Sequence, residues 1–360
     1  MAPRRFVAEQ AAVRVVFGAG AIDQLAAEVR RLNGTRPLVL STPGRRTEAE
    51  ALARGLGAHA TVHAEAVMHV PADNARVARE QASRQEADCL VAIGGGSTIG
   101  LAKAIALERP IPIVAVPTTY SGSEMTPIWG LTEAGLKRTG RDGRVQPKTV
   151  IYDPNLTLGL PPRVSGPSGM NGIAHAVEAL YAQDANPIST LAAAEAIGAL
   201  ARSLPIVVRD PASLDARSDA LYGAWLAGFA LGTTTMCLHH KLCHTLGGTF
   251  NLPHADVHTV ILPHAVAFNR DAAPEAMRVI ANALAPGAAG AGTGDAATGL
   301  FDLAVSLGGP TALKDIGMPE DGLDRAAKLA TENPYFNPRP IDYAGIRQLL
   351  EHAYRGTRPA

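Results

Sequence analysis

The residues best suited to chemistry are four histidines: His175 in one segment of helical pattern, and His240, His244 and His254 in the run CLHHKLCHTLGGTFNLPHADVH. His240 and His244 are four residues apart and so share one helix face. Asn171 and His175 have the same spacing on another predicted helix. Three histidines and a carboxylate at this spacing would bind a divalent transition metal. The position that would supply the carboxylate holds the neutral Asn171, whose amide oxygen is a poor ligand for zinc or ferrous iron.

The residues around these histidines favour a pocket for an anion. His239, Lys241 and His258 lie beside them in the sequence. An amide in place of a carboxylate also removes one full negative charge from the site. We therefore predict an electropositive pocket, although Lys241 alone, or any single histidine, is more often an ordinary surface or core residue.

A glycine-rich turn in the first half is suited to bind phosphate. In AIGGGSTIGLAK, a buried strand is predicted to end at Ile93 before the turn Gly94–Gly96. Ser97 or Thr98 is then expected to cap a helix that runs through Lys103. Backbone N–H groups at such a turn can approach a ligand closely, and a helix N-terminus adds about half a positive charge. Taken alone, GGGS is modest support, since a glycine turn is often only a turn.

A second turn, VPTTYSGSE at 116–124, offers hydroxyl groups from Thr118, Thr119 and Ser121. Both turns leave strands that are predicted to be parallel, so they lie on the same carboxyl edge of one sheet. Ligands of open α/β folds bind at that edge. The two turns together predict a dinucleotide site.

The selector of NAD over NADP is usually an acid after an early strand, where it binds the ribose. Here the strand PLVLS leads to Thr42, with Arg45 and Arg46 just beyond. Without an acid to repel a 2′-phosphate, NADPH is expected to be accepted beside NADH. The two arginines are equally compatible with a solvated surface pair.

The sequence pattern that predicts helices and strands changes near residue 155. Before it, short β-branched runs alternate with helical stretches, which predicts a parallel sheet covered by helices. After it, the runs are longer, rich in alanine and helical in period. We predict an α/β dinucleotide-binding domain over 1–155 and an all-α catalytic domain over 156–360, joined by a linker at 153–166. The predicted strands are 36–42, 88–95, 111–119 and 149–153.

The composition excludes several classes of protein. The 360 residues carry a formal net charge of zero, so no global field attracts nucleic acid or an anionic membrane. The apolar stretches, such as 111–117, look too short to span a membrane. The odd set Cys89, Cys237 and Cys243 has no disulfide-like spacing. A cytoplasmic protein with buried, unpaired cysteines is expected.

Four longer segments match a known family. They are TTYSGSEMTPIWGLTEAGLKRTGRD, GMNGIAHAVEALY, LHHKLCHTLGGTFNLPHADVHTVILPHAVAFN and NPYFNPRPI. With these segments the chain resembles the iron-containing alcohol dehydrogenases, and within them the branch that reduces maleylacetate. The resemblance covers nearly the whole chain and implies the dehydroquinate synthase-like fold and a homodimer. It also implies reduction of the carbon-carbon double bond of maleylacetate to 3-oxoadipate with NADH or NADPH, in the catabolism of aromatic compounds.

The resemblance also implies roles for individual residues. In the wider family the metal is held at the positions of Asn171, His175, His240 and His254, with His244 beside them. This chain keeps the three histidines and lacks the acid. The implied cofactor contacts are Gly95, Gly96, Ser97, Thr118, Thr119 and Lys137, while the acid of the family is absent at Thr42 and a second one at Gly100.

These departures agree with a change of substrate. Reduction of a simple carbonyl needs a Lewis acid to stabilise an alkoxide. Hydride addition to an alkene conjugated with a ketone gives an enolate instead, which imidazole groups and other hydrogen-bond donors can stabilise without metal. We predict no bound metal, with His175, His240 and His254 binding a carboxylate or the enolate and His244 or its neighbours supplying the proton. Weaker candidates for the carboxylates are Tyr120, Lys241, Asn337 and Arg339.

Three alternatives remain open at this point. A metal-dependent alcohol dehydrogenase on the same scaffold would contain zinc or iron at His175, His240 and His254. An enzyme related to dehydroquinate synthase would recycle its NAD without net consumption. A nucleotide-binding protein without turnover is disfavoured, because clustered polar histidines cost desolvation energy.

Overall fold

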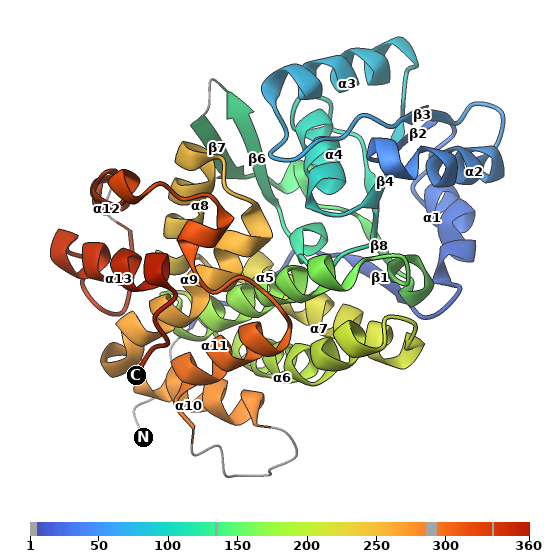
Figure 1. Cartoon of the computed structure of the whole chain (residues 1–360). Helices are drawn as coiled ribbons and strands as arrows, with labels where there is room; N and C mark the ends of the chain where they lie inside the picture. Colours follow the sequence, from blue (N-terminus) through green and yellow to red (C-terminus); the bar gives the residue numbers. More distant parts are fainter. Residues whose placement is uncertain (1–5, 134–135, 286–293, 333–334) are drawn as a thin grey trace. The chain divides into compact units, whose positions relative to one another are not determined.

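The computed structural model describes residues 6–133, 136–285, 294–332 and 335–360 (Figure 1). The chain forms two compact units, Gln10–Leu160 and a second that contains Pro161–Ala360. Each unit is described by itself.

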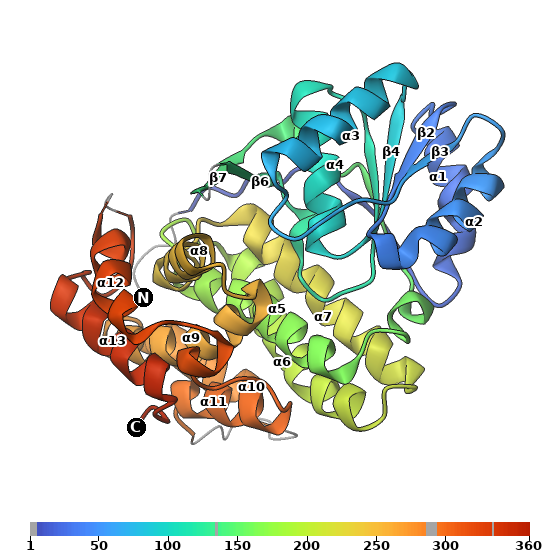
Figure 2. The ribbon, with the colours of Figure 1, turned by 45° about the horizontal axis from the view of Figure 1, so that its top comes forward.

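The first unit is built on a parallel sheet. Among the described residues, six strands pair in the order β1-β8-β5-β4-β2-β3, and every pairing is parallel. Figure 2 shows this sheet with helices on either side. The strands are β1 (Arg14–Phe17), β2 (Pro37–Leu40), β3 (Thr61–His63), β4 (Cys89–Gly94), β5 (Ile113–Pro117) and β8 (Thr149–Tyr152).

Alternation along the strands supplies two cores, one on each face of the sheet. Leu38 and Leu90 point to the face that is covered by α3 (Ala72–Arg84) and α4 (Gly96–Glu108). Val39 and Val91 point to the opposite face, which α1 (Leu25–Arg31) and α2 (Arg46–Leu56) cover. A separate antiparallel hairpin consists of β6 (Ile128–Glu133) and β7 (Leu136–Arg141). This unit confirms the predicted α/β class.

In the second unit, the described residues form helices and no strands. Long helices α5, α6 and α7 pack against one another, and α8 and α9 pack as a neighbouring pair (Figure 1). Close contact between α5, α6 and α7 depends on small residues: Gly169 faces Leu204, and Gly223 faces Leu200. The helices are α5 (Pro162–Tyr181), α6 (Pro187–Arg209), α7 (Leu214–Thr233), α8 (Leu238–Phe250), α9 (His254–Asn269), α10 (Pro274–Leu284), α11 (Ala296–Ser306), α12 (Leu323–Thr331) and α13 (Tyr343–Arg355).

The predicted linker over 153–166 contains the boundary between the two units, which lies between Leu160 and Pro161. The segment is more regular than expected: it holds a short 3-10 helix at Pro154–Thr157, and α5 begins at Pro162, because proline is favoured in the first turn of a helix.

One helix is a longer apolar stretch than the sequence analysis expected. The helix α6 has a window of 18 residues with a mean hydropathy of 1.6, so it is long and apolar enough to cross a membrane. Half of that window is buried, and a buried core helix can have the same length and hydropathy, so this is weak evidence for a membrane span.

A buried lysine ties the first unit together behind its glycine turn. The Lys103 ammonium group, on α4, donates hydrogen bonds to the carbonyl oxygens of Ser123 (2.7 Å) and Ile128 (2.8 Å) and to the Thr126 hydroxyl (2.9 Å). Burial lowers the pKa of Lys103 to about 7, and burial raises the pKa of the neighbouring Glu124 to about 7. One side chain thus holds the segment that follows the second predicted cofactor turn.

Replacing Lys103 with methionine should destabilise the protein. The substitution keeps the bulk of the side chain but removes three buried hydrogen bonds from the Lys103 ammonium group, which costs about 2 to 4 kcal/mol. Urea denaturation should show this loss in the free energy of unfolding. The exposed Lys148→Met is the matched control and should leave the stability unchanged. Equal stability of the two variants would contradict the role given to Lys103.

Candidate active site

One face of α5 carries three polar side chains into the interior of the helical unit. Asn171, His175 and Glu178 are spaced by four and three residues, so they lie along the same side of the helix. Their exposed fractions are 4%, 5% and 0%. Burial of this much polarity requires partners, which come from α8 and α9.

A tight corner brings α8 and α9 to this face. Asn251 ends α8 in the left-handed conformation (φ 52°), and Pro253 precedes the first residue of α9, His254. His240 and His244 lie on successive turns of α8. The sequence Asn-Leu-Pro therefore folds two histidine-bearing helices back on each other within three residues.

The structure gathers the four predicted histidines. The rings of His175 and His240 are stacked with centroids 4.7 Å apart, and the His240 and His244 rings are 6.2 Å apart. The His244 and His254 rings are stacked at 6.4 Å. The histidine ladder of the sequence is thus a continuous row of neighbouring rings.

A chain of hydrogen bonds connects this row to a buried carboxylate. His175 Nδ1 lies 2.7 Å from His240 Nε2, and His240 Nδ1 lies 2.7 Å from Glu178 Oε2. Glu178 also accepts the backbone N–H groups of Cys237 (2.8 Å) and His239 (2.6 Å). The sequence analysis missed Glu178, although its spacing from Asn171 and His175 placed it on the same helix face.

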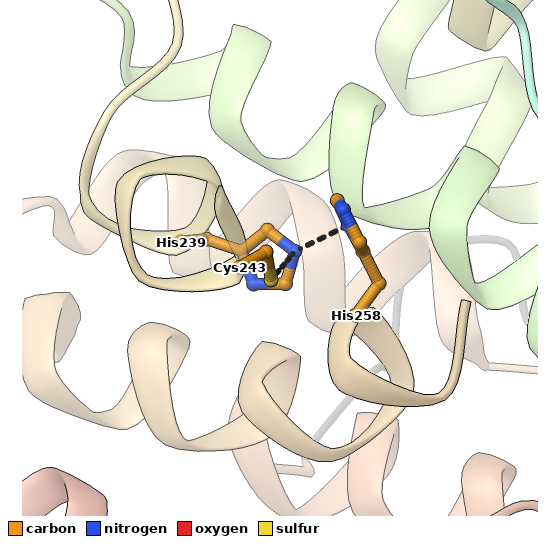
Figure 3. A group of neighbouring side chains, drawn as sticks. All are labelled: His239, Cys243 and His258. Carbon is orange, nitrogen blue, oxygen red and sulfur yellow. Dashed lines mark hydrogen bonds between the residues drawn. The ribbon is translucent and has the colours of Figure 1, made fainter. Parts of the chain in front are cut away.

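A second group of polar side chains lies beside the first. His239 and Cys243 from α8 and His258 from α9 converge (Figure 3). His239 Nε2 lies 2.9 Å from His258 Nδ1 and 3.5 Å from Cys243 Sγ. The His258 ring is 4.4 Å from the His254 ring and 5.1 Å from the His240 ring, so both groups belong to one cluster.

The expected electropositive contribution of His239 and His258 was wrong. Burial, followed by the charges of neighbouring histidines, holds the pKa of each ring well below its usual value, so both are neutral at pH 7. Each ring also keeps one buried nitrogen that has no hydrogen-bond partner among the described residues: His239 Nδ1 and His258 Nε2. The buried Asn171 Oδ1 also has no hydrogen-bond partner among the described residues. Such atoms are suited to contact a ligand.

The weaker candidates of the helical unit contact side chains other than the four predicted histidines. The Lys241 ammonium group is over the Tyr335 ring, 5.6 Å from its centroid. Asn337 exchanges hydrogen bonds with Asn269, and the Arg339 guanidinium stacks 4.0 Å from the centroid of the Phe268 ring.

Asn337 and Arg339 are therefore held at the end of α9 opposite to His254. At about 1.5 Å per residue, the two ends of this helix are about 20 Å apart. The structure does not bring Asn337 and Arg339 to the histidine cluster. Their side chains already have partners on α9, which is a structural reason for the NPRP turn.

The two predicted cofactor turns meet at the carboxyl edge of the sheet. Gly94 and Pro117 are register partners on β4 and β5, and the Thr118 N–H donates to the Gly94 carbonyl at 3.1 Å. A Cβ atom at Gly95 would lie 2.8 Å from Thr119 Cγ2. Only glycine therefore fits at this close approach.

The start of α4 differs from the expectation. The helix begins at Gly96 with Gly95 at its N-cap, and no described side chain caps it, so Ser97 and Thr98 lie within its first turn. A Cβ atom at Gly96 would meet only Ser121 Oγ, at 3.9 Å. The first N–H groups of α4 are thereby left to a ligand, as a phosphate site requires.

The remaining candidates of the α/β unit have mixed surroundings. Tyr120 is fully buried just after β5. Lys137 pairs with Thr132 through the backbone of the β6-β7 hairpin, and its side chain lies outside the described residues. Thr42 precedes a short 3-10 helix after β2.

The arginines beyond Thr42 are already paired. Arg45 forms an ion pair with Glu48, and Arg46 forms one with Glu65. Glycine in place of the family's acid at position 100 has a steric reason, because a Cβ atom there would lie 2.8 Å from Val70 Cγ2. Any side chain at that position would displace Val70.

Known proteins match this chain along its length. A family model described as iron-containing alcohol dehydrogenase matches residues 12–154, and one described as Fe-containing alcohol dehydrogenase family, C-terminal, matches residues 166–354. Maleylacetate reductases from Burkholderia cepacia and Sphingobium indicum are 57% and 54% identical over 356 residues, which is 99% of this chain and of each relative. The crystal structure of a maleylacetate reductase from Agrobacterium tumefaciens is 49% identical, with a TM-score of 0.93 over 99% of this chain and 100% of that one. The chain therefore belongs to the iron-containing alcohol dehydrogenase family.

Proposed function

We propose that this chain is a maleylacetate reductase, which converts maleylacetate to 3-oxoadipate in the catabolism of aromatic compounds. The identity to named maleylacetate reductases over nearly the whole chain supports the choice of substrate. The observation that carries the chemistry is the direct hydrogen bond between His175 and His240 beside the neutral Asn171. We also propose a cytoplasmic homodimer, as the family resemblance implies.

We assign the cofactor to the α/β domain predicted over 1–155 and the substrate to the helical domain predicted over 156–360. The uncapped start of α4 and the close approach at Gly95 fit a pyrophosphate, with Thr118, Thr119 and Ser121 as hydroxyl donors. Either NADH or NADPH is proposed, because no acid stands at Thr42. The ion pairs of Arg45 and Arg46 argue against a dedicated 2′-phosphate site.

The histidine cluster does not fit the divalent metal that the family name implies. Two nitrogens bound to one metal at about 2.1 Å lie at least about 3 Å apart. His175 Nδ1 and His240 Nε2 lie 2.7 Å apart, a distance that places a proton between them. One of the two lone pairs is then unavailable to a metal, and Asn171 adds no charge. We therefore propose a reaction without metal.

A dinucleotide whose pyrophosphate lies at the uncapped start of α4 would supply a hydride to the alkene carbon β to the ketone, and the electron pair of the double bond would move onto the ketone oxygen to give an enolate. We assign binding of the enolate oxygen or a substrate carboxylate to the cluster of His175, His240 and His254, in which both ring nitrogens of His240 already have partners, Glu178 and His175. The neutral amide of Asn171 leaves no full negative charge opposite the dianionic substrate. A proton from His244, between His240 and His254, completes the new C–H bond at the α carbon.

Freshly generated maleylacetate should cause oxidation of NADH or NADPH by the purified protein, and EDTA should not slow the reaction. Absorbance of the reduced nicotinamide measures the rate, and elemental analysis of the same sample measures zinc and iron. Stoichiometric metal together with inhibition by EDTA would favour the metal-dependent alcohol dehydrogenase. Absence of net NADH oxidation with maleylacetate would sink the proposed reaction.

The substitution Asn171→Asp should lower kcat/KM for maleylacetate about tenfold or more. A carboxylate in this buried position repels a dianion and restores the charge of a metal site. Steady-state kinetics and elemental analysis after incubation with Zn²⁺ test both effects. Asn186→Asp adds the same charge at the N-cap of α6, where aspartate caps as well as asparagine, and should change neither. An unaltered kcat/KM in the Asn171 variant would refute the role of this amide.

Replacing His244 with asparagine should lower kcat about 100-fold, because general acid catalysis contributes that much or more. The KM for NADH should change little. The exposed His352→Asn, on α13, controls for loss of a histidine and should keep full activity. Full turnover by the His244 variant would show that the proton comes from another group.

A further inference from the structure

Glu178 has an unusual set of contacts for a fully buried carboxylate. Its Oε1 accepts the His239 N–H at 2.6 Å. Its Oε2 accepts the Cys237 N–H at 2.8 Å and lies 2.7 Å from His240 Nδ1. Both oxygens thus face hydrogen-bond donors, and two of these donors are backbone groups that cannot change their protonation.

The carboxylate dictates the position of a proton on His240. An ionised carboxylate only accepts hydrogen bonds, so His240 Nδ1 must carry the proton. His240 Nε2 then presents its lone pair, and His175 Nδ1, 2.7 Å away, must be the donor of that hydrogen bond. The charge of Glu178 therefore determines which nitrogen carries the proton in both His240 and His175.

The same carboxylate also begins the helix that carries His240. No described side chain of the Cys237 segment caps α8, and the N–H groups at the N-cap and at the second helical position are satisfied by Glu178 from α5. A negative charge at a helix N-terminus is favourable. Helix position and ring tautomer are thus determined by one group.

We propose that Glu178 is a positioning residue of the active site, which fixes the order Glu178–His240–His175 of hydrogen-bond donors and acceptors. This inference rests on the proposed function, because it assigns these rings to the substrate. Glu178 touches no reacting atom in this proposal and acts through His240. Among the described residues, the titratable groups against His240 include Glu178 itself and the rings of His175, His239, His244 and His258 from α5, α8 and α9. The His254 ring lies beside those of His244 and His258.

The substitution Glu178→Gln should reverse this order. Glutamine offers one acceptor oxygen to three donors, and its amide N–H₂ group requires an acceptor. His240 Nδ1 is the only one of the three partners that can become an acceptor. Its proton then moves to Nε2, where it faces the N–H of His175, and the hydrogen bond between the rings is lost.

The experiment compares the histidine tautomers and the kinetics of the purified full-length protein and its variants. Two-dimensional ¹H–¹⁵N spectra of the imidazole nitrogens should show His240 as the Nδ1–H tautomer in the wild type and as the Nε2–H tautomer in Glu178→Gln. The variant should lose about 10- to 100-fold in kcat, the usual effect of removing a group that orients a functional histidine. Its KM for NADH should stay the same.

Asp184→Asn is the matched control. Asp184 accepts the Thr235 N–H at 2.9 Å, two residues before Cys237, so this variant weakens the same segment without touching a histidine. It should keep the His240 tautomer and the wild-type kcat. An equal loss of kcat in both variants would reduce Glu178 to a structural residue.

Two further outcomes keep the proposal separate from the proposed function. Measurement of the His240 tautomer in the wild-type protein requires neither substrate nor a folded variant. Finding Nε2–H on His240 would therefore overturn the inference even if Glu178→Gln fails to fold. Glu178→Asp keeps an acceptor-only group, so it should retain the Nδ1–H tautomer with a smaller loss of kcat. If wild-type protein shows the expected tautomer but does not reduce maleylacetate, the proposed function fails and the positioning role of Glu178 remains.

Discussion

Three hydrogen-bond donors from the start of α8 meet the carboxylate of Glu178 in the interior of the helical unit. Removing a carboxylate from water costs several kcal/mol, and only a full set of good partners offsets that cost. The constraint acts in both directions, since α8 needs the carboxylate for its first N–H groups. The positions of His240 and His244 depend on this contact, because both lie on the helix that it begins.

The desolvation cost of burial also explains the protonation of the neighbouring rings. Burial keeps His239 and His258 neutral, so the cluster avoids the repulsion that several imidazolium ions would create. Neutral rings can still donate hydrogen bonds to an anion. The cluster therefore combines a buried negative charge at Glu178 with the neutral rings of His239 and His258, each of which keeps one buried nitrogen without a hydrogen-bond partner among the described residues.

The α/β unit also uses a buried charged side chain, Lys103, to hold backbone near its predicted ligand site. Parallel strands bring the ends of β4 and β5 into register, so the two glycine- and hydroxyl-rich turns lie side by side, and the Thr118 N–H donates to the Gly94 carbonyl. Lys103 then holds the segment after the second turn from below, through carbonyl groups that need a donor. In both units a buried charged side chain fixes backbone at the place where ligands are proposed to bind.

The sequence by itself determined the fold class and most of the candidate residues, because strand alternation, helical period and histidine spacing are local properties. Spacing alone placed Asn171 and His175, and His240 and His244, on common faces. Only the tertiary structure decided which groups pair across helices. It joined Glu178 to His240, made His239 and His258 neutral through burial, and held Asn337 and Arg339 at the far end of α9. Hydrogen bonding and desolvation depend on neighbours that are distant in the chain, and no periodicity in the sequence encodes them.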